Sequence, residues 1–243
     1  MSTAPVAPQA NHSTGNVFPD MGPVVDKSAL EKLGGAVRAR LALDPAVWHA
    51  PVVQAEIVTV TEFLMPDECA QIIELIDRIA EPSSTYHADH DASIRSSYSG
   101  NVDRFDPFVM MIERRIDDLL GMPSAYGETM QGQRYMPGQQ FKAHYDFFST
   151  KAAYWPGERS RGGQRSWTAM IYLNDVEEGG ETVFERAGVT ATPRQGMLLA
   201  WNNANIDGTP NHYTLHAALP VVRGCKYVIT KWYRTRNWAG LPG

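Results

Sequence analysis

The chain has 243 residues, enough for one large domain or two small ones, and 43% of them are hydrophobic and 20% charged, as in an ordinary globular protein. A net charge of −5 without a stripe of lysine and arginine argues against nucleic-acid binding, and no apolar run is long enough to span a membrane. Cys69 and Cys225 lie far apart and outside any CxxC pattern, which argues against a disulfide framework or a cysteine-rich zinc site. Because the N-terminus also lacks the pattern of a secretory signal, we expect a cytoplasmic protein.

The first predicted elements are a tail, a helix and a strand. Residues 1–26 are rich in Ala, Pro, Ser, Thr and Asn, which predicts a disordered tail. Residues 26–43 follow a helical pattern, in which Ser28 is the expected cap and Glu31 stands at capping-box spacing. Residues 52–64 are β-branched and partly alternating, and they predict a strand.

Two amphipathic helices are expected next. Residues 65–80 place apolar side chains at helical spacing and begin with a proline and an aspartate. Residues 106–123 repeat that pattern and stop at a glycine and a proline. The polar stretch 81–103 between them is predicted to be a loop.

The character of the sequence changes near residue 129. Short aromatic or β-branched segments follow, separated by Gly, Pro, Asn or Asp, and this pattern is typical of an antiparallel sandwich or jelly roll. The predicted fold class is therefore α+β, with a double-stranded β-helix core braced by N-terminal helices. We expect one domain over 27–243, made of a helical support region (27–128) and a catalytic core (129–236).

The motif "FKAHYDFF" contains the first candidate site. On a strand, His144 and Asp146 would project from the same face, and an imidazole with a carboxylate suits a divalent first-row metal. A third ligand is needed, and His216 lies in a strand-like stretch, whereas His212 lies among loop residues. Two histidines and one carboxylate can hold Fe(II) on one side. These residues alone also leave a zinc hydrolase possible.

The segment "KYVITKWYR" contains a second candidate site. As a strand it places Lys226 on one face, and if that face points inward the buried ammonium group requires an anion. The anion could be a bound ligand or a protein carboxylate, or the face could point outward. In "SWTAMIYLND", Thr168 and Tyr172 share a face and could bind an anion by hydrogen bonds, although both residue types are also ordinary in strands.

Residues 57–236 resemble the prolyl 4-hydroxylase branch of the Fe(II)/2-oxoglutarate-dependent dioxygenases. The resemblance rests on "EFLMPDECAQIIEL", "RYMPGQQFKAHYD", "TAMIYLNDVEEGGETVF" and "HAALPVVRGCKYVITKWY", which occur in the family's order. It implies that the iron ligands are His144, Asp146 and His216. It also implies that Lys226 pairs with the far carboxylate of 2-oxoglutarate. The cosubstrate pocket is expected to include Tyr135, Thr168, Tyr172 and Trp232.

The resemblance implies an enzyme similar to procollagen-proline 4-dioxygenase. Such an enzyme uses Fe(II), 2-oxoglutarate and O2, takes ascorbate as reductant, and hydroxylates prolyl residues at the 4-position in a peptide or protein while 2-oxoglutarate yields succinate and CO2. One alternative is the same chemistry on a free amino acid or another small molecule. A second alternative is a jelly-roll binding domain without activity.

The segment 147–166 is expected to be a flexible loop that could cover the site. Arg165 and Trp167 are predicted to contact the substrate, although a solvated basic loop would explain the same residues. The acidic stretch 175–181 contains two glycines and is predicted to be a turn without a catalytic role.

Overall fold

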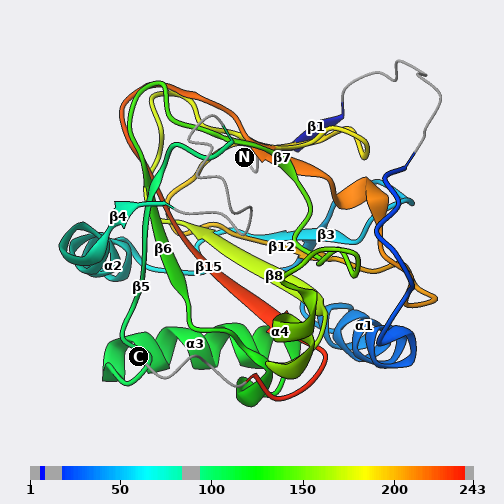
Figure 1. Ribbon diagram of the computed structural model, residues 1–243. Coiled ribbons are helices and arrows are strands. Elements are labelled where there is room, and N and C mark those ends of the chain that lie inside the picture. The colour runs from blue at the N-terminus through cyan, green and yellow to red at the C-terminus, as the bar shows by residue number, and fades with distance from the viewer. Residues whose placement is uncertain (1–5, 9–17, 84–93, 239–243) are drawn as a thin grey trace.

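The computed structural model describes residues 6–8, 18–83 and 94–238, which fold into two facing sheets with helices on the outside of one of them (Figure 1). The larger sheet has eight strands, in the order β2 (Trp48–His49), β3 (Ile57–Val60), β12 (Leu198–Asn202), β8 (Arg165–Tyr172), β15 (Lys226–Arg234), β6 (Gln131–Tyr135), β5 (Tyr98–Asn101) and β4 (Glu81–Pro82). All its described pairings are antiparallel, which confirms the predicted jelly-roll class.

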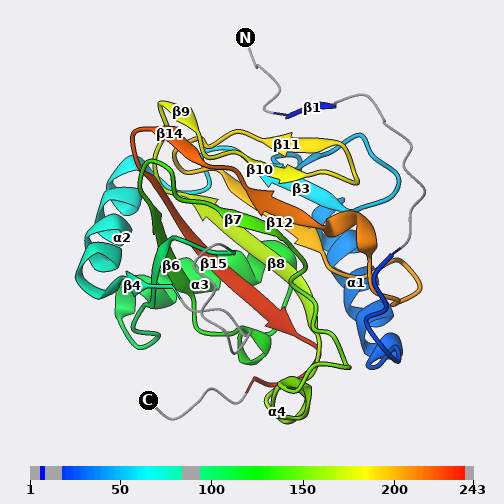
Figure 2. The ribbon, with the colours of Figure 1, turned by 45° about the horizontal axis from the view of Figure 1, so that its top comes forward.

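The smaller sheet has five strands, in the order β1 (Val6–Pro8), β11 (Val189–Ala191), β10 (Thr182–Phe184), β13 (His216–Ala218) and β7 (Phe141–His144). A separate two-stranded ribbon joins β14 (Val221–Arg223) to β9 (Glu178–Gly179). Figure 2 shows β7, β10 and β13 in front of the large sheet. The predicted turn at 175–181 therefore includes one short strand.

Three long helices cover the outer face of the large sheet: α1 (Lys27–Leu41), α2 (Pro66–Ile79) and α3 (Pro107–Leu120) (Figure 1). Their buried side chains form one apolar core with alternate residues of the central strands, such as Trp167 and Ile171 of β8 and Ile229 of β15. The residues between them on the same strands belong to a second core, between the two sheets. Strand alternation thus separates the layer that supports the fold from the layer that holds the pocket.

The ends of the helices follow from local chemistry. Asp106 accepts hydrogen bonds from the amides of Phe108 and Val109 at the start of α3, and Gly121 ends that helix with a φ of 64°. The predicted cap of α1 is wrong, because the helix begins one residue before Ser28 and its N-cap is Asp26.

The predicted tail also differs from the structure. Residues 6–8 form β1, and residues 18–26 are held to the domain: Met21 O accepts a 2.9 Å hydrogen bond from the amide of Thr150, and an Asp26 oxygen accepts one from Thr235 Oγ1. The remainder of the predicted tail, residues 1–5 and 9–17, lies outside the described residues.

The boundary between a helical support region and a β-core is not sharp. The support region contributes β2, β3, β4 and β5 to the large sheet, and β4 and β5 come from the stretch predicted as a polar loop. Residues 84–93 of that stretch lie outside the described residues. The segment 147–166 contains the helix α4 (Trp155–Ser160) and the start of β8, so part of it is regular structure rather than a flexible loop. Short 3-10 helices complete the described fold at Ser124–Tyr126 and His212–Thr214. Within the described parts of the chain, no helix has both the length and the apolar character needed to cross a bilayer.

Candidate active site

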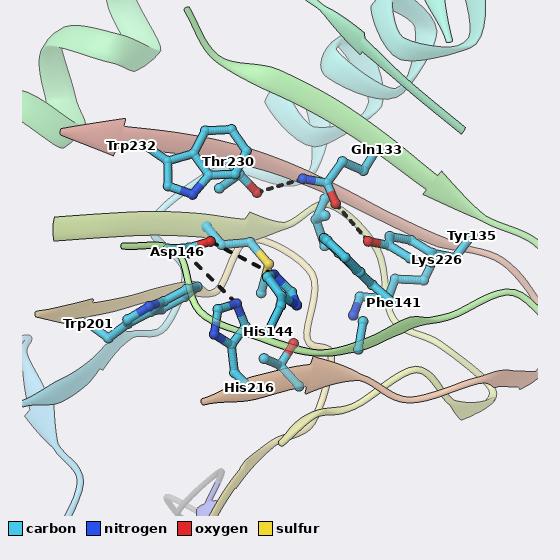
Figure 3. Close-up of a pocket in the computed structure, with 14 residues that line it drawn as sticks. Gln133, Tyr135, Phe141, His144, Asp146, Trp201, His216, Lys226, Thr230 and Trp232 are labelled. Carbon is cyan, nitrogen blue, oxygen red and sulfur yellow. Dashed lines mark hydrogen bonds and ion pairs between the residues drawn. The ribbon is translucent and has the colours of Figure 1, made fainter. Parts of the chain in front are cut away.

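Strand pairing in the small sheet brings the two predicted histidine ligands together. β13 and β7 are antiparallel neighbours, and His216 lies directly opposite His144 in their register. The centroids of the two rings are 4.3 Å apart. Such a pairing places the side chains on one face, here the face toward the large sheet, as Figure 3 shows.

Asp146 follows two residues after the end of β7 and turns its carboxylate toward both histidines. Its Oδ1 is 3.8 Å from His144 Nε2, and its Oδ2 is 4.0 Å from His216 Nε2. One ligand atom from each of the three residues lies within 4.8 Å of the others. The predicted ligand set therefore converges on one point.

The protonation of the two rings fits a metal. Nδ1 of His144 lies 2.9 Å from the carbonyl oxygen of Lys142, and Nδ1 of His216 lies 2.9 Å from that of Thr214. A carbonyl oxygen can only accept, so each Nδ1 carries the hydrogen and each Nε2 keeps a free lone pair directed at the cluster. Two imidazole nitrogens and one carboxylate oxygen are the ligand set of non-haem Fe(II) oxygenases, so the residues fit that metal.

The charges around the cluster are set for cation binding. Burial and the neighbouring His216 lower the pKa of His144 to about 3, so this ring is neutral near pH 7. Burial opposes ionisation of Asp146, but the two histidines, Arg165 and the hydroxyl of Thr168 outweigh it and hold the pKa of this carboxyl below its ordinary value. A buried carboxylate beside two imidazole nitrogens is a site for a cation.

Lys226 lies at the other end of the same pocket, as Figure 3 shows. Its side chain is 1% exposed, and its Nζ lies 5.3 Å and 5.4 Å from the ring centroids of Tyr135 and Tyr172. Burial lowers the pKa of Lys226 to about 7, although the negative charge of Glu181 opposes this shift. Among the described residues no carboxylate lies within ion-pair distance of this Nζ. The face of Lys226, which the strand pattern left open, therefore points inward.

The four other residues expected around the cosubstrate divide into two pairs. Tyr135 and Trp232 line the pocket. Tyr172 and Thr168 are buried behind its wall: the Tyr172 hydroxyl donates a 2.7 Å hydrogen bond to Thr182 Oγ1, and Thr168 Oγ1 donates one of the same length to Asp146 Oδ2. Each of these two hydroxyls already has a protein partner, and their contact with 2-oxoglutarate stays a prediction.

Other pocket residues were not predicted from the sequence: Gln133, Phe141, Met170, Thr182, Trp201, Ala218, Val228 and Thr230. Gln133 connects two strands, since its Nε2 donates to Thr230 Oγ1 and its Oε1 accepts from the hydroxyl of Tyr135. A usable signal existed for Gln133, which stands two residues before Tyr135 on β6, and for Thr230, which alternates with Lys226. For Trp201 and Thr182 the sequence alone offered none, because their strands had no other marked residue.

Of the two residues predicted to contact the substrate, Trp167 lies away from the pocket and Arg165 lies beside it. Trp167 is 1% exposed and packs in the core beneath the helices, on the side of β8 away from the pocket. Arg165 is buried and forms a two-pronged ion pair with Glu128, through hydrogen bonds of 2.6 Å and 2.8 Å. Its guanidinium group also lies 4.2 Å from the ring centroid of Trp232, so Arg165 borders the pocket through that ring.

A jelly roll that holds two histidines and an aspartate at one end of a pocket and a buried lysine at the other defines the class of 2-oxoglutarate- and Fe(II)-dependent oxygenases. Comparison with known sequences agrees: the sequence pattern of the 2OG-Fe(II) oxygenase superfamily matches residues 130–234, which include all four of these residues.

Individual relatives narrow the class. The chain is 32% identical over 194 residues to "Probable prolyl 4-hydroxylase 3" and 32% identical over 200 residues to "Probable prolyl 4-hydroxylase 10", both from Arabidopsis thaliana. These matches cover 70% and 72% of the chain, which spans 66% and 68% of the two relatives' lengths. The chain belongs to the prolyl 4-hydroxylase family of 2-oxoglutarate-dependent dioxygenases.

A solved structure supports the same fold. The viral collagen prolyl hydroxylase of Paramecium Bursaria Chlorella virus-1, solved as a 2-oxoglutarate complex, superposes with a TM-score of 0.58 at 26% identity. The superposition covers 73% of this chain and 95% of the viral chain. The double-stranded β-helix predicted from the sequence is thereby confirmed.

Proposed function

We propose that this protein hydroxylates prolyl residues of a peptide or protein at the 4-position and couples this reaction to the conversion of 2-oxoglutarate to succinate and CO2. The observation that carries the proposal is one pocket with a metal-binding triad at one end and, at the other, a buried lysine that has no carboxylate within ion-pair distance in the described part of the chain. The prolyl substrate is supported by the names of the relatives, which are prolyl 4-hydroxylases and a collagen prolyl hydroxylase.

The residues have separate tasks in this proposal. His144, Asp146 and His216 would hold Fe(II), which when bound supplies the oxidising power needed to hydroxylate an unactivated carbon. Lys226 would bind the far carboxylate of 2-oxoglutarate through a charge-assisted hydrogen bond. Thr182 lines the pocket, and its hydroxyl group accepts the hydrogen bond through which Tyr172 would support this end.

The walls of the pocket would exclude water and orient the ligand. Phe141 stacks on His144 with ring centroids 3.7 Å apart, and Trp201 meets His216 edge-on at 4.8 Å. These aromatic contacts fix the planes of both imidazoles. A site held in this way needs little rearrangement when its ligands arrive.

Succinate formation tests the proposal directly. The protein should release succinate from 2-oxoglutarate only when Fe(II) and a proline-rich peptide are both present, and His144→Ala should abolish this release while circular dichroism shows an intact fold. A His144→Ala variant that turns over like the wild type would refute the iron assignment. Succinate release stimulated by a free amino acid instead of the peptide would support the small-molecule alternative.

Two further properties remain proposals. Ascorbate would act as reductant, and the test is whether turnover declines over successive cycles without it.

A cytoplasmic location is proposed from the two cysteines, which are free thiols in the structure. A binding domain without activity would need neither the buried lysine nor the free lone pairs of both rings.

A further inference from the structure

A chain of buried hydrogen bonds ends on Asp146 of the metal-binding triad. Thr168 Oγ1 lies 2.7 Å from Asp146 Oδ2, and Asn203 Nδ2 lies 2.9 Å from Thr168 Oγ1. Asp146, Thr168 and Asn203 are respectively 5%, 0% and 1% exposed. Water therefore does not compete for these bonds, and each group depends on the next.

The direction of the hydrogen bonds is fixed by chemistry. The carboxylate of Asp146 can only accept, so the single hydroxyl proton of Thr168 points at Oδ2. Thr168 Oγ1 has then no proton left for Asn203, and the atom of Asn203 that faces it must be the amide nitrogen, which donates. The hydrogen bonds therefore run from Asn203 through Thr168 to Asp146, and we call this chain of three side chains the relay.

The relay stands on rigid parts of the fold. Thr168 lies in the centre of the large sheet, where it is paired with Trp201 of β12 on one side and Trp232 of β15 on the other. The backbone of Asn203 is held by two hydrogen bonds, to Ser166 O at 2.7 Å and from the amide of Asn211 at 3.0 Å. Neither donor can shift without disturbing a sheet.

The relay also selects one oxygen of the carboxylate. Oδ2 is engaged by Thr168, whereas Oδ1 has no hydrogen-bond donor among the described residues and lies nearer to His144 Nε2. We propose that Asn203 and Thr168 are positioning residues that lock Asp146 so that it offers Oδ1 alone to the metal. A carboxylate that binds through one oxygen leaves an additional coordination position for cosubstrate or dioxygen.

This inference rests on the proposed function, because it assumes that a divalent metal binds the triad. The experiment is calorimetric titration of the metal-free protein with Mn(II), which needs no turnover. Thr168→Val removes the hydroxyl and keeps the shape, and we expect it to weaken Mn(II) binding roughly 10- to 100-fold, the usual effect of losing a group that orients a metal ligand. Thr168→Ser keeps the hydroxyl and should restore affinity close to that of the wild type.

Asn203→Asp tests the direction of the relay. The new carboxylate cannot donate, so it competes with Asp146 for the single proton of Thr168, and Mn(II) affinity should fall as it does in Thr168→Val. If Thr168→Val does not fold, this second variant decides alone, since it changes neither shape nor volume. Thermal unfolding of each metal-free variant identifies a general loss of structure.

Thr59→Val is the matched control. Thr59 is 1% exposed in β3 of the same sheet, its hydroxyl has no hydrogen-bond partner in the described structure, and it does not line the pocket. This variant should bind Mn(II) like the wild type. Wild-type affinity in both Thr168→Val and Asn203→Asp would overturn the relay, whereas failure of the wild type itself to bind Mn(II) would overturn the proposed function.

Discussion

The ammonium group of Lys226 is buried in a wall of tyrosine rings, and burial of a charge without a counter-charge is costly. This destabilising charge lies in the pocket, opposite the metal-binding triad. A dicarboxylate that reaches from the metal to Lys226 would remove the cost on binding. Lys226 therefore lowers the stability of the ligand-free protein and favours the binding of a dicarboxylate.

Replacement of Lys226 by alanine should raise the KM for 2-oxoglutarate roughly 10- to 150-fold, since a hydrogen bond to a charged group contributes about 1.5–3 kcal/mol. The measurement is succinate release against 2-oxoglutarate concentration at saturating peptide. Lys226→Arg keeps the charge and should lose less. An unchanged KM in Lys226→Ala would show that the anion binds elsewhere.

The lowered pKa of Lys226 predicts a pH dependence. Below about pH 7 the free protein already carries the ammonium group, and above it the group is neutral and must take up a proton when the carboxylate binds. Affinity for 2-oxoglutarate should therefore fall about tenfold per pH unit above neutrality, up to the higher pKa of the complex. Arginine stays charged, so Lys226→Arg should show a flatter profile between pH 7 and 9 in the same titration, and parallel profiles would exclude Lys226 as the cause.

At the scale of elements, buried ion pairs tie the helical layer to the large sheet. Lys231 of β15 and Asp117 of α3 are almost fully buried, and their Nζ and Oδ1 atoms are 2.8 Å apart. The hydroxyl of Tyr233 donates to the same oxygen at 2.6 Å. These bonds fix α3 beneath β15, whose opposite face carries Lys226.

Asp117→Ala should lower the free energy of unfolding by about 3–5 kcal/mol, because it leaves the ammonium group of Lys231 buried with only the more distant Glu113. Urea denaturation followed by circular dichroism measures the change. Arg114→Ala on the same helix breaks an exposed ion pair with Asp118 and serves as control, with an expected loss of at most about 1 kcal/mol. Equal losses in the two variants would contradict this account of α3.

The two ends of the segment 148–164, which follows Asp146, are joined by the side chain of Gln164. Gln164 accepts a 2.6 Å hydrogen bond from the amide of Phe148 and donates a 2.9 Å bond to its carbonyl oxygen. Gln164→Ala removes both of these hydrogen bonds to the backbone of Phe148, so amide exchange at Phe148 should accelerate and proteolysis within 149–163 should become faster. Exchange measured by NMR at Phe148 and at a distant core amide such as Ile229 separates local opening from general unfolding, and equal acceleration at both positions would reject the local role.

Most elements were predictable because their signals are local. Helical spacing and terminal proline and glycine residues located α2 and α3 within a residue or two. The predicted cap Ser28 failed because tertiary contacts of Asp26 decide where α1 begins. The predicted flexible loop failed because α4 is held by Glu158, whose buried carboxylate pairs with Arg234 of β15, a contact that no local pattern reveals.

At the scale of the whole molecule, the site depends on pairings between strands that are distant in sequence. His144 and His216 meet because β7 and β13 are neighbours in register, and Lys226 faces them from the other sheet. Alternation along β15 left open whether the face of Lys226 points inward, and only the resemblance to the family indicated that it does. The hydrogen bonds of Thr168 and Tyr172 could not be predicted, since they depend on which side chains the folded sheets place opposite those hydroxyls.

The central claim is 4-hydroxylation of peptidyl proline, and mass spectrometry of proline-rich peptides tests it most directly. After incubation with Fe(II), 2-oxoglutarate and ascorbate, the wild type should add the mass of one oxygen atom to prolyl residues, and hydrolysis should release 4-hydroxyproline in amounts equal to the succinate formed. Asp146→Ala should yield neither product. Succinate formed without oxygen in any proline, or oxygen found only at another carbon, would contradict the account.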